Sequence, residues 1–400
     1  MDGSLGGRAA VIILFITIFS YPLCLAQVQD NRIACFLLGS VYSSICPLPN
    51  YFTEDPLFTY ETDPQQAGLA LDERRRLDRL YFPRSRQMLL DKFDMIFISD
   101  PRLDHFTAKQ FGDLEYAFKE GNMPSFWAFG PSYGFISVTV LNEVLPITDY
   151  EGYIHRPWRV IFHEEREPVF TPFIALGMES IPGEAYGRMT SRQGSTVWAD
   201  MVPLNLPWMV SWRPGGSEAG LSWVCADEFN MVWWGLTPET RGTNPYAIDL
   251  VTNLVLYSLD RPVITSIHSR HQARNQLSSF RTQKLTVYSV LAWADMFGAN
   301  IIKLSQELTD LDSQIPSAID SYLEQDYATT ISTMETLSIK LGEIGTDAID
   351  LKDQALFWVF IIEWLVVSAA AIIGGVSVWS LMVRRSMYRD AGTTKISPIY

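Results

Sequence analysis

The sequence predicts a protein of the α/β class, followed by an α-helical hairpin stalk and one transmembrane helix. Short apolar runs alternate with amphipathic stretches between residues 32 and 260, a pattern typical of parallel strands joined by helical crossovers. Residues 270–352 instead carry continuous helical spacing. Residues 364–383 hold no charged side chain, and a helix of about 20 residues spans about 30 Å, the thickness of a bilayer's hydrocarbon core.

Residues 1–26 have the pattern of a signal peptide. Arg8 supplies the positive charge, an apolar stretch follows it, and Cys24 and Ala26 occupy the small-residue positions of a cleavage site before Gln27. An uncleaved membrane anchor is the alternative interpretation. The first folded domain is therefore expected to cover residues 27–262.

The first half of this domain contains the clearest strand signals. Three near-continuous apolar runs are expected to be strands buried on both faces: Ile33–Leu38, Asp94–Ser99 and Ser125–Phe129. Thr107 to Glu120 is expected to form a helix, because Thr107 can cap it, Gln110 follows three residues later and Gly121 can end it. This order predicts parallel strand pairing.

The second half of the domain predicts a different arrangement. Strands are expected at Pro168–Met178, Trp208–Trp212 and Leu221–Cys225, the last two forming a hairpin around a glycine-rich loop. A helix is expected from Asn244 to Tyr257, with Asn244 as its cap and Pro245 at its first position.

Ser132 lies in a segment, Gly130 to Gly134, that fits the G-x-S-x-G pattern of a nucleophilic serine. A serine nucleophile needs a base and a group that orients the base. None of the five histidines follows Ser132 in a convincing order: His105, His155, His163, His268 and His271. We therefore expect this segment to be a loop at the carboxyl edge of the sheet, where Asp100, Ser132 and Tyr133 line a ligand-binding crevice.

The order of four segments, FDMIFISDP, TAKQFGDLEYAFKEGN, SFWAFGPSYGF and LNEVLPI, resembles the class I glutamine amidotransferase-like superfamily, in particular its membrane-anchored branch. The hairpin that ends at Asp227 and the segment NPYAIDLVTNLVLYSLDRPV are similar to later parts of the family. The resemblance covers roughly residues 32–262 and implies a Rossmann-like or flavodoxin-like domain. The family places a cysteine where this chain has Ser132, so amidotransferase chemistry is not implied. The C-terminal arrangement resembles archaeal membrane proteins.

Residues 263–354 predict a membrane-proximal hairpin of two long helices joined at Pro316. The second helix carries coiled-coil-like spacing, with an apolar seam of Tyr327, Ile331, Met334, Ser338, Leu341, Gly345, Ala348 and Leu351, flanked by Leu337 and Ile344. The first helix offers Leu285, Tyr288, Ala292, Met296, Ala299, Ile302, Leu308 and Leu311. The seams can pack on each other or receive another subunit.

Residues 355–383 predict the transmembrane helix. Arg384, Arg385 and Arg389 follow it and favour a cytoplasmic tail at residues 384–400, with the N-terminal domain outside the cell membrane. Glu363 is either an interfacial carboxylate or an intramembrane contact. Two small-x-x-x-small faces offer close helix packing, Ala370 with Gly374 and Ala371 with Gly375.

Charge and cysteine content exclude several classes of function. The external part has 26 Lys and Arg against 42 Asp and Glu, so neither nucleic acid nor an anionic lipid surface is an expected partner of this domain. Cys35 and Cys46 are the expected disulfide, with three separate thiols, Cys225 included, as the alternative. Neither a cofactor nor a metal site is expected, because no zinc-like cysteine spacing occurs.

These observations predict a non-enzymatic, membrane-anchored surface protein. It would act as a binding or scaffold subunit of an envelope or membrane complex, possibly as a homo-oligomer. The alternative is an extracellular serine hydrolase or amidase that uses Ser132.

Overall fold

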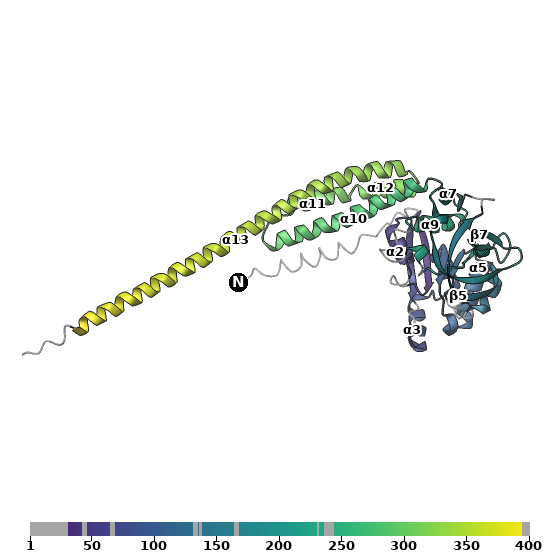
Figure 1. The fold of residues 1–400 in the computed structure, drawn as a ribbon, viewed down its shortest axis with the longest axis horizontal. Coiled ribbons are helices and arrows are strands. Elements are labelled where there is room, and N and C mark those ends of the chain that lie inside the picture. The colour runs from purple at the N-terminus through teal and green to yellow at the C-terminus, as the bar shows by residue number, and fades with distance from the viewer. Residues whose placement is uncertain are drawn as a thin grey trace, which may run out of the picture.

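The computed structural model describes residues 31–41, 46–64, 69–130, 135, 138–163, 168–229, 232–235 and 244–393. An α/β head carries a helical stalk, and the stalk continues into one long helix (Figure 1). The predicted signal peptide and the end of the predicted tail, residues 394–400, lie outside the described residues.

The head is built on a mixed sheet of nine strands in the order β2-β1-β3-β4-β9-β8-β7-β5-β6. The parallel half consists of β2 (Phe58–Pro64), β1 (Ile33–Gly39), β3 (Met95–Ser99), β4 (Ser125–Ala128) and β9 (Ser222–Cys225). The antiparallel half consists of β8 (Leu206–Trp212), β7 (Thr196–Val202), β5 (Ile147–Phe162) and β6 (Gly183–Ser191). Parallel pairing thus holds for half of the sheet and not for all of it.

The three buried strands expected early in the chain are confirmed as β1, β3 and β4, and the late hairpin is confirmed as β8 and β9. The strand expected at Pro168–Met178 is wrong. Two short helices stand there, α7 (Thr171–Ile174) and the 3₁₀ helix η3 (Met178–Ser180). Pro172 lies in the first turn of α7, and Gly177 adopts a left-handed φ of 77° that ends any extended run.

The capping residues expected from the sequence are found in some helices of the head and not in others. They are α2 (Leu48–Glu54), α3 (Leu71–Tyr81), α4 (Arg86–Lys92), α5 (Ala108–Lys119) and α9 (Ala247–Ser258), with the 3₁₀ helices η1 (Leu103–His105), η2 (Thr139–Val144) and η4 (Val232–Trp234). Thr107 and Gln110 form the expected capping box of α5. Asn244 does not cap α9, because its Nδ2 donates a hydrogen bond to the carbonyl of Trp233 instead.

Aromatic side chains join the two halves of the sheet in the core. Trp208 of β8 packs on Trp233 and Trp234, with ring centroids 4.6 and 5.9 Å away, and Phe126 of β4 packs on Phe229 at 5.2 Å. All five rings are buried. The aromatic-rich second half of the domain therefore forms core rather than surface at these positions.

The chain runs along the length of the stalk three times. α10 (Ile267–Met296) leaves the head, α11 (Ile302–Asp312) and α12 (Ile315–Leu323) return, and α13 (Tyr327–Thr393) runs outward again (Figure 1). Left-handed residues mark the turns, Gly298 before α11 and Gln325 before α13. The predicted two-helix hairpin joined at Pro316 is therefore wrong. Pro316 lies in the first turn of α12, where its missing N–H has no intrahelical partner to lose.

The packed face of α13 repeats every three or four residues, as expected. Its buried residues are Tyr327, Thr330, Met334, Leu337, Leu341, Ile344, Ala348 and Ala355. Leu337 and Ile344 lie at the centre of this face rather than beside it, and Ser338 and Gly345 are only half-buried. On α10 the expected face is wrong, because Leu285, Tyr288, Ala292 and Met296 are exposed and Leu277, Phe280, Val287, Leu291 and Ala294 are buried.

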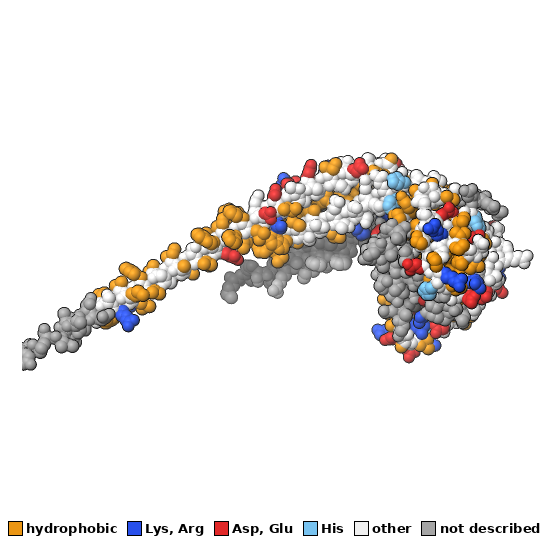
Figure 2. All heavy atoms as spheres, in the orientation of Figure 1, with side chains coloured by type: hydrophobic (Ala, Val, Ile, Leu, Met, Phe, Trp, Pro, Cys, Tyr) orange, Lys and Arg blue, Asp and Glu red, His pale blue; other side chains and the backbone are white. Residues whose placement is uncertain are grey.

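Ala355 is the last buried residue of α13 within the described part of the chain, and the residues that follow it are exposed or half-buried. Its apolar part has a mean hydropathy of 2.4, and it is the helix among the described residues that is long and apolar enough to cross a membrane. Figure 2 shows hydrophobic side chains along this part of the helix. Glu363, Ala370 and Ala371 are exposed there, and a Cβ at Gly374 or Gly375 would touch nothing within 4 Å.

Candidate functional site at the carboxyl edge of the parallel strands

Four parallel strands, β1, β3, β4 and β9, end at the same edge of the sheet. Gly39 at the end of β1 has a φ of +100°, and a Cβ there would collide with the carbonyl oxygen of Ser99 at the end of β3. Asp100 has a φ of 38°, a conformation that is costly for a residue with a side chain. Backbone strain of this kind collects at functional sites, so this edge is the first place to look for one.

Backbone contacts hold Asp100 at the edge. Its N–H donates to the carbonyl of Ala128 at 2.8 Å, and the hydroxyl of Ser40 donates to the Asp100 carbonyl at 3.4 Å. The N–H of Ser40 donates to the Ser99 carbonyl at 2.7 Å. Asp100, which the sequence nominates, is therefore buried at the junction of β1, β3 and β4. Ser132 and Tyr133 lie outside the described residues.

Glu228 approaches Gly130, the first glycine of the G-x-S-x-G segment. A Cβ added to Gly130 would lie 2.5 Å from Oε2 of Glu228. Any residue other than glycine at position 130 would push this carboxylate away, so the first glycine of the G-x-S-x-G segment permits a close contact between β4 and the chain after β9. Sequence reasoning noted Asp227 and missed Glu228, although two adjacent acids directly after a buried strand are a visible signal.

Asp227 is a buried acid beside Glu228. Its side chain is fully buried, and among the described residues neither of its carboxylate oxygens has a hydrogen-bond partner. Burial, and then the charge of Glu228, hold the pKa of Asp227 well above its usual range. The shift favours the protonated form of Asp227, which can donate a hydrogen bond from inside the edge.

Cys46 belongs to the same edge. Burial raises the pKa of its thiol to about 12, while a hydrogen bond with the Ser99 side chain opposes that rise. Cys35 pairs with Met95, four residues before Ser99 along β3, so the two cysteines lie at levels of the sheet about 13 Å apart. A disulfide needs Cα atoms within about 7 Å. The structure accordingly holds Cys35, Cys46 and Cys225 as buried free thiols, and the expected Cys35–Cys46 disulfide is wrong.

Three described histidines contact carboxylates other than Asp100, Asp227 and Glu228. Nε2 of His105 lies 3.0 Å from Asp78, Nε2 of His163 lies 3.0 Å from Asp200, and Nδ1 of His271 lies 3.4 Å from Asp249. No group of three or more metal-binding side chains occurs within the described part of the chain. The edge thus presents acids and hydroxyls, which suit binding of a polar group through hydrogen bonds.

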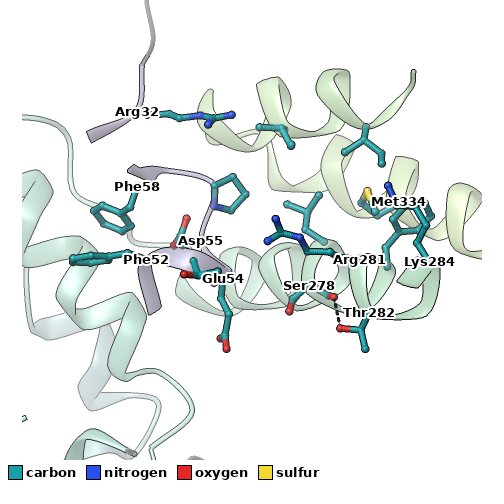
Figure 3. A pocket seen from close by; sticks show the side chains of 16 residues that line it. Arg32, Phe52, Glu54, Asp55, Phe58, Ser278, Arg281, Thr282, Lys284 and Met334 are labelled. Atoms are coloured by element: carbon teal, nitrogen blue, oxygen red, sulfur yellow. Dashed lines mark hydrogen bonds between the residues drawn. The ribbon is translucent and has the colours of Figure 1, made fainter. Parts of the chain in front are cut away.

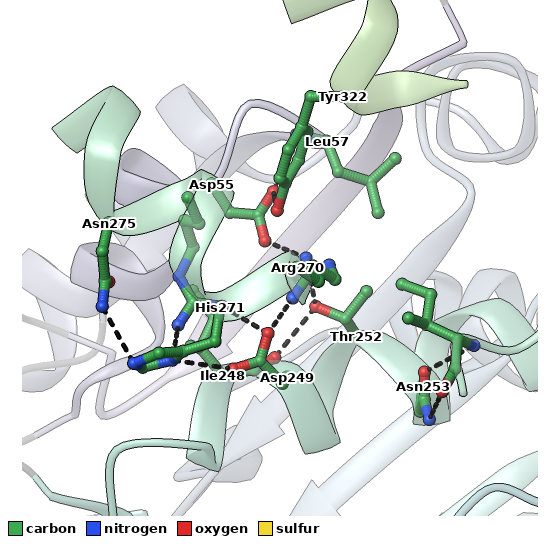
Figure 4. Close-up of polar contacts among 12 residues, drawn as sticks. Asp55, Leu57, Ile248, Asp249, Thr252, Asn253, Arg270, His271, Asn275 and Tyr322 are labelled. Atoms are coloured by element: carbon green, nitrogen blue, oxygen red, sulfur yellow. Dashed lines mark hydrogen bonds and ion pairs between the residues drawn. The ribbon is translucent and has the colours of Figure 1, made fainter. Parts of the chain in front are cut away.

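A second buried polar cluster lies where the head meets the stalk. We call Asp55, Asp249, Arg270, Arg274 and Tyr322 the junction cluster (Figure 4). Arg270 of α10 forms ion pairs with Asp55, after α2, and with Asp249 of α9. Arg274 donates to Asp249 at 2.5 Å, and the Tyr322 hydroxyl donates to Asp55 at 3.1 Å. Residues from the head and from two stalk helices therefore share one network.

The junction cluster balances its own charge inside the protein. Its two guanidinium groups face two carboxylates, and the exposed fraction of each side chain is at most 4%. Burial raises the pKa of Asp249, but Arg274 and Arg270 outweigh it and lower the pKa to about 2. Asp249 is therefore ionised at neutral pH, and every member of the cluster is needed to keep the others paired.

The head, the junction cluster and the apolar end of α13 together describe an α/β protein with a helix able to cross a membrane. No protein-family model and no curated protein matches the chain.

Two solved structures are similar to part of this chain. One is titled "Cytoplasmic Protein STM1381 from Salmonella typhimurium LT2", with 13% sequence identity and a TM-score of 0.42, covering 56% of this chain and 99% of that chain. The other is titled "Structure of PurLQS from Thermotoga maritima", with 12% identity and a TM-score of 0.33, covering 57% and 99%. Both TM-scores lie below 0.5, and neither likeness carries an argument about what this chain does.

Proposed function

We propose that this chain is a non-enzymatic, membrane-anchored surface protein that serves as a binding or scaffold subunit of a membrane or envelope complex. Its head would lie outside the cell and its basic tail inside. The observation that carries the proposal is the continuity of α13, which packs in the stalk up to Ala355 and is apolar beyond it. One helix thus both supports the head and enters the membrane.

The stalk suits rigid display of the head. The 29 residues of α13 from Tyr327 to Ala355 span about 42 Å. Three other helices pack along this length, and the junction cluster ties Arg270 of α10 to Asp55 of the head. A buried ion pair of this kind has no low-energy alternative position. The head is therefore held at a defined distance from the bilayer, as a scaffold requires.

We further propose that the head is a Rossmann-like domain of amidotransferase type that lacks amidotransferase chemistry. The strand order β2-β1-β3-β4-β9 supports this proposal, because it has the flavodoxin-like pattern. In such sheets the strand order reverses between the first and third strands, and ligands bind in the crevice at that point. Ser40 and Asp100 lie at that point of this sheet, so a bound partner or ligand would meet them first.

Association with other membrane subunits would use the apolar part of α13. Ala370 and Gly374 lie one turn apart and leave open space beside the helix. Small residues allow two membrane helices to approach closely. A second copy of this helix, or a helix of another subunit, is the expected occupant.

The test compares the size of the assembly in mild detergent for the full chain and for a variant that carries both Ala370→Leu and Gly374→Leu. We expect the wild type to migrate above the mass of a monomer and the variant to lose that species. Val366→Leu and Ile373→Leu together serve as the control, since they change side chains that are already large. A wild type that is purely monomeric and carries no second protein would overturn the proposal.

A serine hydrolase is the second candidate, favoured by the contact of Glu228 with Gly130. That contact supports this candidate because it brings a carboxylate to Gly130, two positions before Ser132 in the sequence. A fluorophosphonate probe would label such an enzyme through its serine. We expect no labelling of the wild type; labelling that Ser132→Ala abolishes would establish the hydrolase instead.

A further inference from the structure

We propose that a cavity between head and stalk, the elbow pocket, binds a small amphipathic organic anion from the aqueous phase. The pocket has a volume of about 510 Å³, within the size range of small-molecule sites. Its head side consists of Arg32 and the segment from the end of α2 to the start of β2, and its stalk side comes from α10, α12 and α13 (Figure 3). This proposal concerns a ligand and holds whether or not the chain has a partner subunit.

The inner wall of the elbow pocket is apolar. Phe52 and Phe58 line it from the head, and Phe280 and Met334 line it from the stalk. All four side chains are buried, with at most 4% of their surface exposed. Ile315 and Ile319 add half-buried aliphatic surface from α12. Because the four buried side chains expose almost no surface, an aromatic or aliphatic ligand body would gain free energy mainly by covering Ile315 and Ile319.

The mouth of the elbow pocket carries a cation that is available to a ligand. Figure 3 shows the side chain of Arg281 extending from α10 toward the head wall. The side chain of Arg281 forms neither an ion pair nor a hydrogen bond within the described part of the chain, whereas Lys284 is bound to Asp312 at 2.7 Å. The nearby carboxylate of Asp55 is already occupied by Arg270 and Tyr322.

Apolar surface next to a free guanidinium selects the chemical class of the ligand. A neutral apolar molecule would leave Arg281 unused, and a simple inorganic anion would leave the apolar wall uncovered. A carboxylate or phosphate attached to an apolar body satisfies both, because arginine binds either group through two parallel hydrogen bonds. The chain is acidic overall, with a formal net charge of −14. The unpaired Arg281 beside the apolar cavity has the opposite sign to this net charge.

Distance from the membrane decides the source of the ligand. Met334 in the pocket precedes Leu356, where the unpacked part of α13 begins, by 22 residues or about 33 Å of helix. A lipid that remains in the bilayer cannot bring its headgroup that far. The ligand is therefore a free amphipathic anion that reaches the pocket from the surrounding water.

The experiment uses the full chain in nanodiscs of zwitterionic lipid and measures binding by titration calorimetry. Three probes share one apolar body: 2-naphthoate, 2-naphthyl phosphate and the neutral 2-naphthamide. Empty nanodiscs supply the background. We expect saturable binding of at least one of the two anions, which identifies the preferred headgroup, and affinity for the amide weaker by at least about tenfold, as loss of a charge-assisted hydrogen bond predicts.

Variants locate the site of binding. Arg281→Glu should weaken binding of the anion by at least about tenfold, whereas Arg281→Lys keeps the charge but not the two parallel hydrogen bonds and should weaken binding less than Arg281→Glu does. Lys340→Glu makes the same charge change on an exposed position of α13 outside the pocket and should change the affinity by less than about twofold. Ile319→Trp fills the cavity and should also weaken binding. If Ile319→Trp fails to fold, the exposed Arg281 variants still decide the question.

Three results would overturn the proposal: no saturable binding of either anion, equal binding of 2-naphthamide, or unchanged affinity in Arg281→Glu. Nanodiscs that contain anionic lipid provide the final arm. If such lipid competes with the bound anion, a bilayer lipid occupies the pocket and the aqueous source is wrong.

Discussion

The guanidinium of Arg270 in the stalk forms an ion pair with the carboxylate of Asp55 in the head, and water reaches almost none of either side chain. Their exposed fractions are 1% and 0%. The two residues are 215 positions apart in the chain. Water cannot reach this contact to replace either partner. The ion pair therefore fixes the position and orientation of the head on the stalk.

Replacing Arg270 should destabilise the protein strongly. Arg270→Met leaves Asp55 and Asp249 with fewer partners in a buried environment, and breaking such a network costs about 3–5 kcal/mol of unfolding free energy. Urea unfolding followed by tryptophan fluorescence measures this change. Lys303→Met is the matched control, because Lys303 and Glu307 form an exposed pair at 3.5 Å that contributes about 0–1 kcal/mol. Equal effects of the two variants would contradict a structural role for the junction cluster.

Stability should fall as pH rises toward 8 because of Asp63 at the end of β2. Burial, and then the charge of Asp78 in α3, raise the pKa of Asp63 from 3.8 to about 8, and Asp78 is itself bound to His105 of η1. The folded state therefore binds a proton that the unfolded state releases above about pH 4. The contribution of Asp63 to the free energy of unfolding is fully present below that pH and is lost progressively up to about pH 8.

Asp63→Asn tests this assignment. The amide cannot ionise, so the variant should show a smaller decline in unfolding free energy between pH 5 and pH 8 than the wild type, and Asp227, whose pKa is also raised, should account for a remaining decline. Thermal unfolding at a series of pH values measures the slope for both proteins. Asp72→Asn changes a carboxylate that is 96% exposed and should leave the slope unchanged. A wild type whose stability is flat across this range would refute the prediction.

The three described cysteines should be free and unreactive in the native state. Burial raises the pKa of Cys35, Cys46 and Cys225, so few thiolates form at neutral pH and alkylating reagents cannot reach them. Mass spectrometry after alkylation without reductant should find all three unmodified in the native protein and all three modified in denaturant. If Cys35 and Cys46 stay unmodified in denaturant until a reductant is added, they form a disulfide after all.

Leu337 should contribute more to the stability of the stalk than Ile339, which lies two positions further along the same helix. Leu337 is 1% exposed and Ile339 is 67% exposed. Leu337→Ala removes buried methyl groups and should cost about 2–5 kcal/mol, whereas Ile339→Ala should change stability by less than about 0.5 kcal/mol. Denaturant unfolding of both variants checks this. The reverse order would mean that α13 packs through a different face.

Much of the fold is encoded in short segments and could be predicted from them. The strands β1, β3 and β4 are continuous apolar runs that only a two-sided burial satisfies. Helix α5 carries its own capping box, and the apolar part of α13 is defined by its length and lack of charge. These features depend on residues within one or two turns of each other, so neighbouring sequence is sufficient to identify them.

The errors fall where several packings fit the same pattern. Apolar residues lie on two adjacent faces of α10, and only the neighbouring helices decide that Leu291 is buried while Ala292 is exposed. Pro316 can end a helix or begin one, and the three-pass stalk uses it to begin α12. The residues of the candidate site divide in the same way into those that the sequence predicts and those that depend on packing. Asp100 follows a recognisable strand, but Glu228 reaches Gly130 only through the pairing of β9 with β4.

The sequence by itself determined that an α/β domain precedes a helical segment and an apolar helix, because hydrophobic periodicity and charge are local properties. Tertiary structure alone decided which charges are buried. Asp55 and Arg270 are ordinary surface residue types, and their pairing depends on desolvation by segments far away in the chain. That pairing positions the head, and with it the sheet edge and the elbow pocket.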